Sequence, residues 1–255
     1  MKRDLGVILV HGAFMGEWVW EFVRPALLNY GLRVYTPTLS AAGKGGAMPG
    51  IGSSQVDLGT HILEVTRLIE SMALDQVVLV GHSYAGLVIT GVAERLLKRV
   101  TGLVYLDAVV PFFGGSLIDS FDPLRRHDVL RTLADSVADG RWFPDDPQKM
   151  LRNFGMHSGP LFDWALERLS GQAIKSVVEK LPSDIMKSVS DIPKYYVYFS
   201  DKKGYETFHQ SEMLTKNNSS FIYSEIFAGH CAQLTHPYDV AVRIAGITAH
   251  VSVGW

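Results

Sequence analysis

The sequence predicts an α/β fold, a doubly wound and mainly parallel six-stranded sheet with a helical cap inserted after the fourth strand. Six short apolar runs are separated mainly by segments of helical periodicity, which is typical of a parallel sheet covered by helices. The chain has 255 residues, of which 47% are hydrophobic and 20% charged, enough for one large core. Between residues 112 and 192 the strand pattern gives way to helical segments and turns. We therefore expect a sheet core formed by residues 1–111 and 193–255, and a cap formed by residues 112–192.

The elements follow from these patterns in chain order. The expected strands are continuous apolar runs that end at turn-forming or polar residues: residues 5–10, 32–35, 77–80, 102–106, 195–199 and 221–226. The expected helices repeat apolar residues every three or four positions: residues 17–30, 56–72, 87–98, 206–214 and 237–249 in the core, and 122–137, 147–154, 161–169 and 173–181 in the cap. The glycine-rich residues 41–54 are expected to form a loop.

Composition disfavours several classes of function and site. The formal net charge is −2 and no long basic run is present, which disfavours nucleic acid and anionic membranes as partners. Cys231 is the only cysteine, so no internal disulfide can form and a reducing compartment is expected. No window reaches the roughly 18 apolar residues of a membrane helix. The sequence therefore predicts a soluble cytoplasmic protein.

The strongest motif follows the third expected strand. Val77 to Val80 run directly into Gly-His-Ser-Tyr-Ala-Gly at residues 81–86, and a helical segment follows at once. A sharp turn between a buried strand and a helix exposes one side chain, here Ser83, as the nucleophile of an acyl-transfer enzyme. The usual pattern is G-x-S-x-G, whereas this chain has Ala85 at the last position. The alternative is an ordinary strand-to-helix turn that contains a serine.

Other polar residues follow strand ends as well. Asp107, Asp201 and His230 each come just after an expected strand, and ligands of such sheets bind beyond the carboxyl ends of the strands. His230 is the best candidate for the general base, because it follows the last strand and the order serine, acid, histidine fits a hydrolase triad. Chain order favours Asp201 as the acid, and Asp107 is the alternative.

Two backbone N–H groups are expected to hold the oxyanion of a tetrahedral intermediate. Tyr84 follows the nucleophile directly, and Ala13 lies in the turn after the first strand. Among the other histidines, His82 is expected to be structural and His11 to hydrogen-bond the backbone. No pair of histidines or cysteines has metal-ligand spacing, so neither a metal nor a cofactor is expected.

These motifs resemble the small α/β hydrolases of the plant methylesterase and hydroxynitrile-lyase group, with their bacterial esterase relatives. The resemblance is carried by residues 10–14 with Trp18 and Trp20, and by residues 81–86, 105–108 with Pro111, 168–172 and 229–237. It implies a Ser–His–Asp triad under a helical cap, with Ser83 as nucleophile and His230 as base.

The chain departs from this family at two places. Family members usually place the acid in a Thr-Glu-Asp sequence, and an ungapped match puts Lys202 at the position of that aspartate. The hydroxynitrile lyases resemble one another in having Thr after the first histidine and Lys after the catalytic one. Here these positions are Gly12 and Cys231, which favours an esterase over a lyase.

We therefore predict an esterase that cleaves a small, largely apolar or aromatic ester through an acyl-enzyme, without a cofactor. The aromatic residues expected to contact the substrate are Phe14, Phe112, Trp142, Phe143 and Trp164. A lyase or cyclase that uses the same triad, and a ligand-binding receptor on a hydrolase scaffold, are the alternatives. The expected partner is a small-molecule ester, and a possible homodimer is left open.

Overall fold

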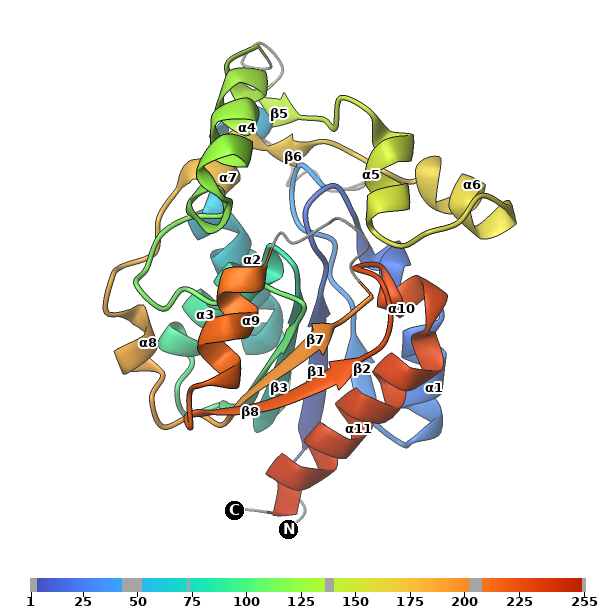
Figure 1. The fold of residues 1–255 in the computed structure, drawn as a ribbon. Helices are drawn as coiled ribbons and strands as arrows, with labels where there is room; N and C mark the ends of the chain where they lie inside the picture. Colours follow the sequence, from blue (N-terminus) through green and yellow to red (C-terminus); the bar gives the residue numbers. More distant parts are fainter. Residues whose placement is uncertain (1–3, 43–51, 73, 136–139, 202–207, 254–255) are drawn as a thin grey trace.

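The computed structural model describes residues 4–42, 52–72, 74–135, 140–201 and 208–253. Its centre is a six-stranded, fully parallel sheet (Figure 1) in the order β2-β1-β3-β4-β7-β8. The strands are β1 (Leu5–Val10), β2 (Arg33–Tyr35), β3 (Gln76–His82), β4 (Val100–Leu106), β7 (Lys194–Phe199) and β8 (Phe221–Ile226). All six expected strands are present, and the predicted fold class is confirmed.

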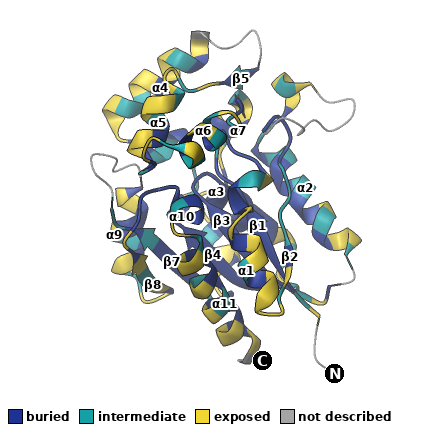
Figure 2. Cartoon of the chain, turned by 90° about the vertical axis from the view of Figure 1, so that its right-hand side faces the viewer, coloured by how far each residue is buried: buried dark blue, intermediate teal, exposed yellow. Residues whose placement is uncertain are grey.

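Helices cover both faces of this sheet because its central strands are apolar on both sides. Alternate residues of β1 show this: Ile8 and Val10 join one buried cluster, whereas Val7 and Leu9 join the other. The first cluster lies under α2 (Leu58–Ser71) and α3 (Ala85–Arg95), and the second lies under α1 (Val23–Asn29) and α11 (Pro237–Val253). Figure 2 shows the strands buried between helices whose outer faces are exposed.

The segment between β4 and β7 is largely helical, as the sequence predicts. It contains η3 (Ile118–Ser120), α4 (Pro123–Asp135), α5 (Pro147–Asn153), α6 (Pro160–Leu166), α7 (Ile174–Val178) and α8 (Ile185–Ser188). Helices α4, α5 and α6 lie above the carboxyl ends of the strands (Figure 1). The segment also holds an antiparallel pair that was not expected, β5 (Arg141–Trp142) with β6 (Gln172–Ala173). Strands of two residues are too short to produce an alternating pattern.

Several helix boundaries differ from the expected ones. The segment 17–30 divides into a 3-10 turn, η1 (Glu17–Trp20), and α1. Pro25 lies in the first turn of α1, where its missing N–H has no helical acceptor. Between β7 and the end of the chain lie α9 (His209–Lys216), α10 (Ala232–Thr235) and α11. Most of the expected loop at 41–54 and the start of the expected helix at 206–214 lie outside the described residues.

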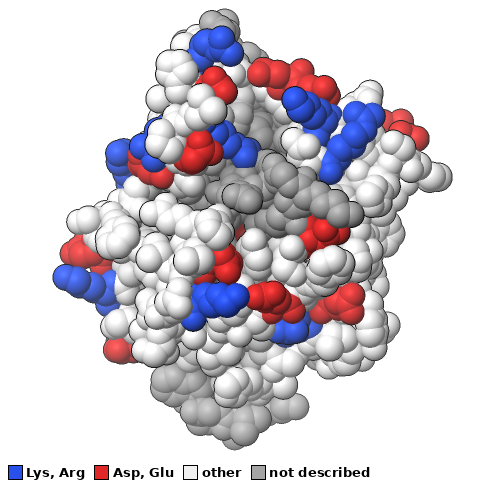
Figure 3. All heavy atoms as spheres, in the orientation of Figure 1, with Lys and Arg blue, Asp and Glu red and all other residues white. Residues whose placement is uncertain are grey.

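Two features concern the surface. On the face shown in Figure 3, basic and acidic side chains are interspersed rather than gathered by sign. In the part of the chain that the structure describes, none of the helices combines the length and the apolar character needed to span a bilayer.

Candidate active site

Ser83 lies at the sharp turn between β3 and α3. Its φ is 58°, a left-handed conformation that non-glycine residues rarely adopt. A Cβ on Gly81 would lie 2.7 Å from the Ala85 carbonyl oxygen, and one on Gly86 would lie 2.0 Å from the Val109 oxygen. These two positions therefore require glycine, whereas the methyl group of Ala85 is accommodated in the core. The departure from the usual motif at Ala85 thus leaves the turn intact.

His230 and Asp107 form a buried pair beside this turn. The His230 Nδ1–H donates to Asp107 Oδ2 at 2.6 Å, and the two side chains are 2% and 0% exposed. Asp107 follows β4 with a left-handed φ of 44°, and its own N–H donates to the Val197 oxygen at 2.8 Å. Because Nδ1 carries the hydrogen donated to the carboxylate, Nε2 is the basic nitrogen of a neutral His230 ring.

Among the described residues, the carboxylate that hydrogen-bonds His230 is that of Asp107, the alternative acid, and not that of Asp201, which chain order favours. Asp201 follows β7, is partly exposed, and its backbone N–H donates to the Ala228 oxygen at 3.0 Å. Both aspartates follow strands at the same edge of the sheet. The choice between them depends on the direction of each side chain, which chain order does not encode. Lys202, at the acid position of the ungapped family match, lies outside the described residues.

Two phenylalanine rings, from different segments of the chain, pack against the His230 imidazole. Phe154, just after α5, meets it edge to face at 4.7 Å, and Phe208, just before α9, lies 5.4 Å away between centroids. Packing against both rings restricts the rotation of the imidazole. Neither ring belongs to a recognisable motif, so the sequence carries no signal for its place in the site.

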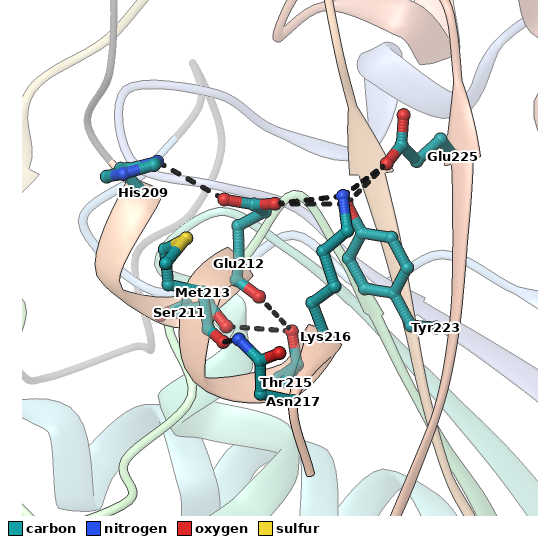
Figure 4. Close-up of polar contacts among 9 residues, drawn as sticks. All are labelled: His209, Ser211, Glu212, Met213, Thr215, Lys216, Asn217, Tyr223 and Glu225. Atoms are coloured by element: carbon teal, nitrogen blue, oxygen red, sulfur yellow. Dashed lines mark hydrogen bonds and ion pairs between the residues drawn. The ribbon is translucent and has the colours of Figure 1, made fainter.

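Polar contacts link α9, the helix that follows Phe208, to β8 (Figure 4). Glu212 is buried and contacts His209 Nδ1 at 3.2 Å and the Tyr223 hydroxyl of β8 at 3.3 Å. Burial and nearby carboxylates raise the pKa of Tyr223, so its hydroxyl stays protonated and can donate. This network ties α9 to the sheet edge beside the candidate site.

The turn after β1 lies directly against the nucleophile. A Cβ on Gly12 would be 2.8 Å from the Cβ of Ser83, so only glycine allows this approach. His11 Nδ1 donates to the Gly12 oxygen at 2.8 Å, and its Nε2 accepts the Leu39 N–H at 3.0 Å. Burial lowers the pKa of His11 to about 4, so the ring is neutral and holds the turn that contains Ala13.

A cavity of about 460 Å³ opens above Ser83 and His230. Of the five aromatic residues expected to contact the substrate, Phe14 and Trp142 line it, and their rings meet edge to face at 4.7 Å. The described residues of its wall also include residues that the sequence analysis did not select for the site: Met15, Leu117, Phe121, Arg125, Pro144, Asp145, Asp146, Lys149, Met150, Asn153, Phe154 and Phe208.

The other three aromatic residues lie outside this wall. Phe112 packs on Phe221 with ring centroids 5.5 Å apart, and Trp164 packs on Trp18 at 5.5 Å. Phe143 is 45% exposed. The frequency of aromatic residues in the cap predicts apolar packing. Only the fold decides which of these rings face the cavity and which pack between other elements.

Comparison with known proteins now identifies the family. A model described as "Alpha/beta hydrolase family" matches residues 7–244. The chain belongs to the alpha/beta hydrolase family. Among solved structures, an extracellular alpha/beta-hydrolase from a Paenibacillus species superposes with a TM-score of 0.80 at 22% identity, covering 95% of this chain and 98% of the other. The pyrethroid hydrolase PytH gives a TM-score of 0.72 at 22% identity, covering 97% and 98%.

Several curated relatives of this alpha/beta hydrolase are named as esterases. A carbendazim hydrolyzing esterase of Nocardioides sp. is 48% identical over 111 residues, which are 44% of this chain and 45% of the relative. Methylesterase 1 of Arabidopsis thaliana is 34% identical over 114 residues, 43% of this chain and 41% of the relative. Each match thus spans less than half of the relative's length. The predicted resemblance to methylesterases and bacterial esterases is confirmed.

The cap of this alpha/beta hydrolase contacts the His230 loop through backbone atoms as well as through the Phe154 ring. A Cβ on Gly229 would lie 2.6 Å from the Cα of Gly155, and Gly155 itself has a φ of +84°. Beside them, the Cys231 N–H donates to the Phe154 oxygen at 3.0 Å. The end of α5 therefore helps to fix the backbone that carries His230.

Proposed function

We propose that this alpha/beta hydrolase is a serine esterase in which Ser83 is the nucleophile, His230 the general base and Asp107 the acid. The observation that carries the proposal is that a strained Ser83 and the His230 of a buried His230–Asp107 pair line one cavity. Serine is a poor nucleophile on its own, and a neutral imidazole beside it supplies the base that it needs.

The reaction proceeds in two stages. The Ser83 Oγ attacks the ester carbonyl carbon while its proton moves to His230 Nε2, and the imidazolium then protonates the departing alkoxide. Water next attacks the acyl-enzyme, giving its proton to His230, and the Ser83 oxygen leaves with that proton as the acid product departs. Asp107 stabilises the imidazolium in both stages and keeps the proton of Nδ1 in place.

The negative charge on the carbonyl oxygen is held by backbone N–H groups of Ala13 and Tyr84. Their support is positional: Tyr84 follows the nucleophile, and the Gly12–Ala13 turn lies against Ser83. Each such donor contributes about 3 kcal/mol to the stabilisation of a tetrahedral intermediate.

The substrate is a small, largely apolar or aromatic ester. The cavity of about 460 Å³ and its Phe14–Trp142 edge-to-face pair support an aromatic or branched apolar acyl group. The names of the relatives point the same way, since they include methylesterases and a carbendazim hydrolyzing esterase. We also infer a cytoplasmic setting from the single cysteine, Cys231, which is buried.

Hydrolysis is favoured over cyanohydrin cleavage by two residues near the site. One relative is an Alpha-hydroxynitrile lyase of Arabidopsis thaliana, 30% identical over 116 residues. Lyases that this chain resembles have Thr and Lys where it has Gly12 and Cys231. The Cys231 thiol is buried and burial raises its pKa, so it is neutral; unlike a lysine, it places no cation beside His230 that could hold cyanide.

The test measures turnover of p-nitrophenyl acetate and p-nitrophenyl benzoate by the native chain and by Ser83→Ala. We expect a burst of p-nitrophenol equal to the enzyme concentration whenever deacylation is the slower stage, and a loss of turnover of at least about 10⁴-fold in Ser83→Ala. Mass spectrometry should find the acyl group on Ser83. Equal turnover by both proteins would refute the proposal, and tight binding of an aromatic ester without turnover would favour the receptor alternative.

A further inference from the structure

His82, the residue before Ser83, is a buried imidazole that the proposed reaction does not use. It ends β3 and is 0% exposed. Its Nε2–H donates to the backbone oxygen of His230 at 2.8 Å, and the two imidazole rings lie 4.5 Å apart between centroids. The residue beside the nucleophile thus holds the backbone of the candidate base.

The second nitrogen of His82 is also in use. The amide nitrogen of Gln233, a buried residue of α10, donates to His82 Nδ1 at 3.4 Å. With Nε2 donating and Nδ1 accepting, the ring is the neutral Nε2–H tautomer. Burial keeps the pKa of His82 well below its ordinary value, so this tautomer persists at neutral pH. The His230 oxygen, which can only accept, and the Gln233 amide nitrogen thus both favour this tautomer.

The imidazole of His82 also packs against the turn expected to supply an oxyanion donor. A Cβ on Gly12 would lie 3.0 Å from His82 Nδ1. On other sides the ring meets Trp20 edge to face at 6.5 Å and stacks on Phe199 at 6.4 Å. Its orientation is consequently fixed by neighbours from three other strands or helices.

We propose that His82 is a positioning residue that sets the distance between the nucleophile and the base through its hydrogen bond to the His230 backbone. This inference rests on the proposed function. Asp107 holds the side chain of His230, and the contact of Cys231 with Phe154 holds the residue that follows. The hydrogen bond from His82 links this loop directly to the segment carrying Ser83.

The physical consequence concerns proton transfer. The proton passes from Ser83 to His230 only over a short, aligned distance, and a displacement of about 1 Å can cost about 100-fold in rate. His82 is not part of the cavity wall, so substrate binding should not depend on it. A positioning role therefore predicts a fall in kcat with KM almost unchanged.

The experiment compares His82→Leu with His82→Gln in the full chain. Leucine fills the space without a donor, whereas the glutamine amide nitrogen can donate from about the position of Nε2. We expect His82→Leu to lower kcat by about 10- to 100-fold with KM changed less than about twofold, and His82→Gln to recover most of the loss. The rate at which a phosphonate ester labels Ser83 should fall in parallel with kcat.

Thr90→Val is the matched control for loss of a buried polar group near the turn. The Thr90 hydroxyl contacts the Tyr105 hydroxyl at 2.8 Å and the Gly86 oxygen at 2.7 Å, and it is buried like His82. Its removal should lower the melting temperature and leave kcat unchanged. If His82→Leu does not fold, Gln233→Leu replaces it, with an expected loss of about 3- to 10-fold in kcat because the buried His82 Nδ1 loses its donor and the ring loses a contact that orients it.

The outcomes separate this inference from the proposed function. The inference is overturned if a folded His82→Leu protein, or Gln233→Leu where that variant replaces it, has the native kcat. It is also overturned if His82→Leu and His82→Gln lower kcat by the same factor. Turnover that survives in Ser83→Ala would instead refute the proposed function.

Discussion

Replacing Asp107 by asparagine tests the arrangement of the triad most directly. Asparagine has nearly the same shape, so the turn after β4 should survive, but it carries no charge to stabilise the imidazolium of His230. At the observed 2.6 Å, a full charge pair with an effective dielectric constant of about 20 is worth about 6 kcal/mol. Since each 1.4 kcal/mol is about tenfold in rate, this predicts a loss of about 10⁴-fold in kcat.

The assay is steady-state hydrolysis of p-nitrophenyl acetate, with Asp201→Asn as the matched control. Asp201 contacts the sheet edge through its backbone N–H, which asparagine retains, so its kcat should change less than about threefold. Thermal unfolding of both variants checks that each is folded. A loss confined to Asp201→Asn, with Asp107→Asn close to native, would refute the assignment of the acid and return it to the aspartate that chain order favours.

Three further perturbations test other parts of the site. Gly229→Ala places a Cβ 2.6 Å from the Cα of Gly155. Calorimetry should find a destabilisation of about 1–3 kcal/mol, and kcat should fall. The control Gly246→Ala, in open space on α11, should stabilise the fold slightly. Trp142→Ala removes a ring from the cavity wall and should raise KM for an aromatic ester about tenfold. Trp164 lies outside the wall, so Trp164→Ala should leave KM unchanged. Equal changes in KM would contradict the placement of the two rings. The folded state keeps His11 neutral down to about pH 4, whereas the unfolded chain protonates it below about pH 6.5. Urea unfolding should therefore show the free energy of unfolding falling by about 3 kcal/mol as the pH is lowered from about 6.5 to about 4. His11→Asn should remove this part of the pH dependence.

The fold could be predicted from the sequence because its determinants are local. Each strand of the sheet is a continuous apolar run, and runs of this kind need cover on both faces, which the intervening helices provide. The turn at Ser83 was equally visible, since Gly81 and Gly86 leave room for backbones that approach closely. The pair β5–β6 was missed because two residues carry no periodicity.

Residue type and chain order determined which side chains reach the edge of the sheet: Ser83, His230 and two aspartates, each placed just after a strand. Only the tertiary structure decided which of them meet. The left-handed turn at Asp107 directs that carboxylate to His230, and packing of the cap decides that Trp142, rather than Trp164, faces the cavity. These choices depend on side-chain directions and long-range contacts, which a pattern along the chain does not contain.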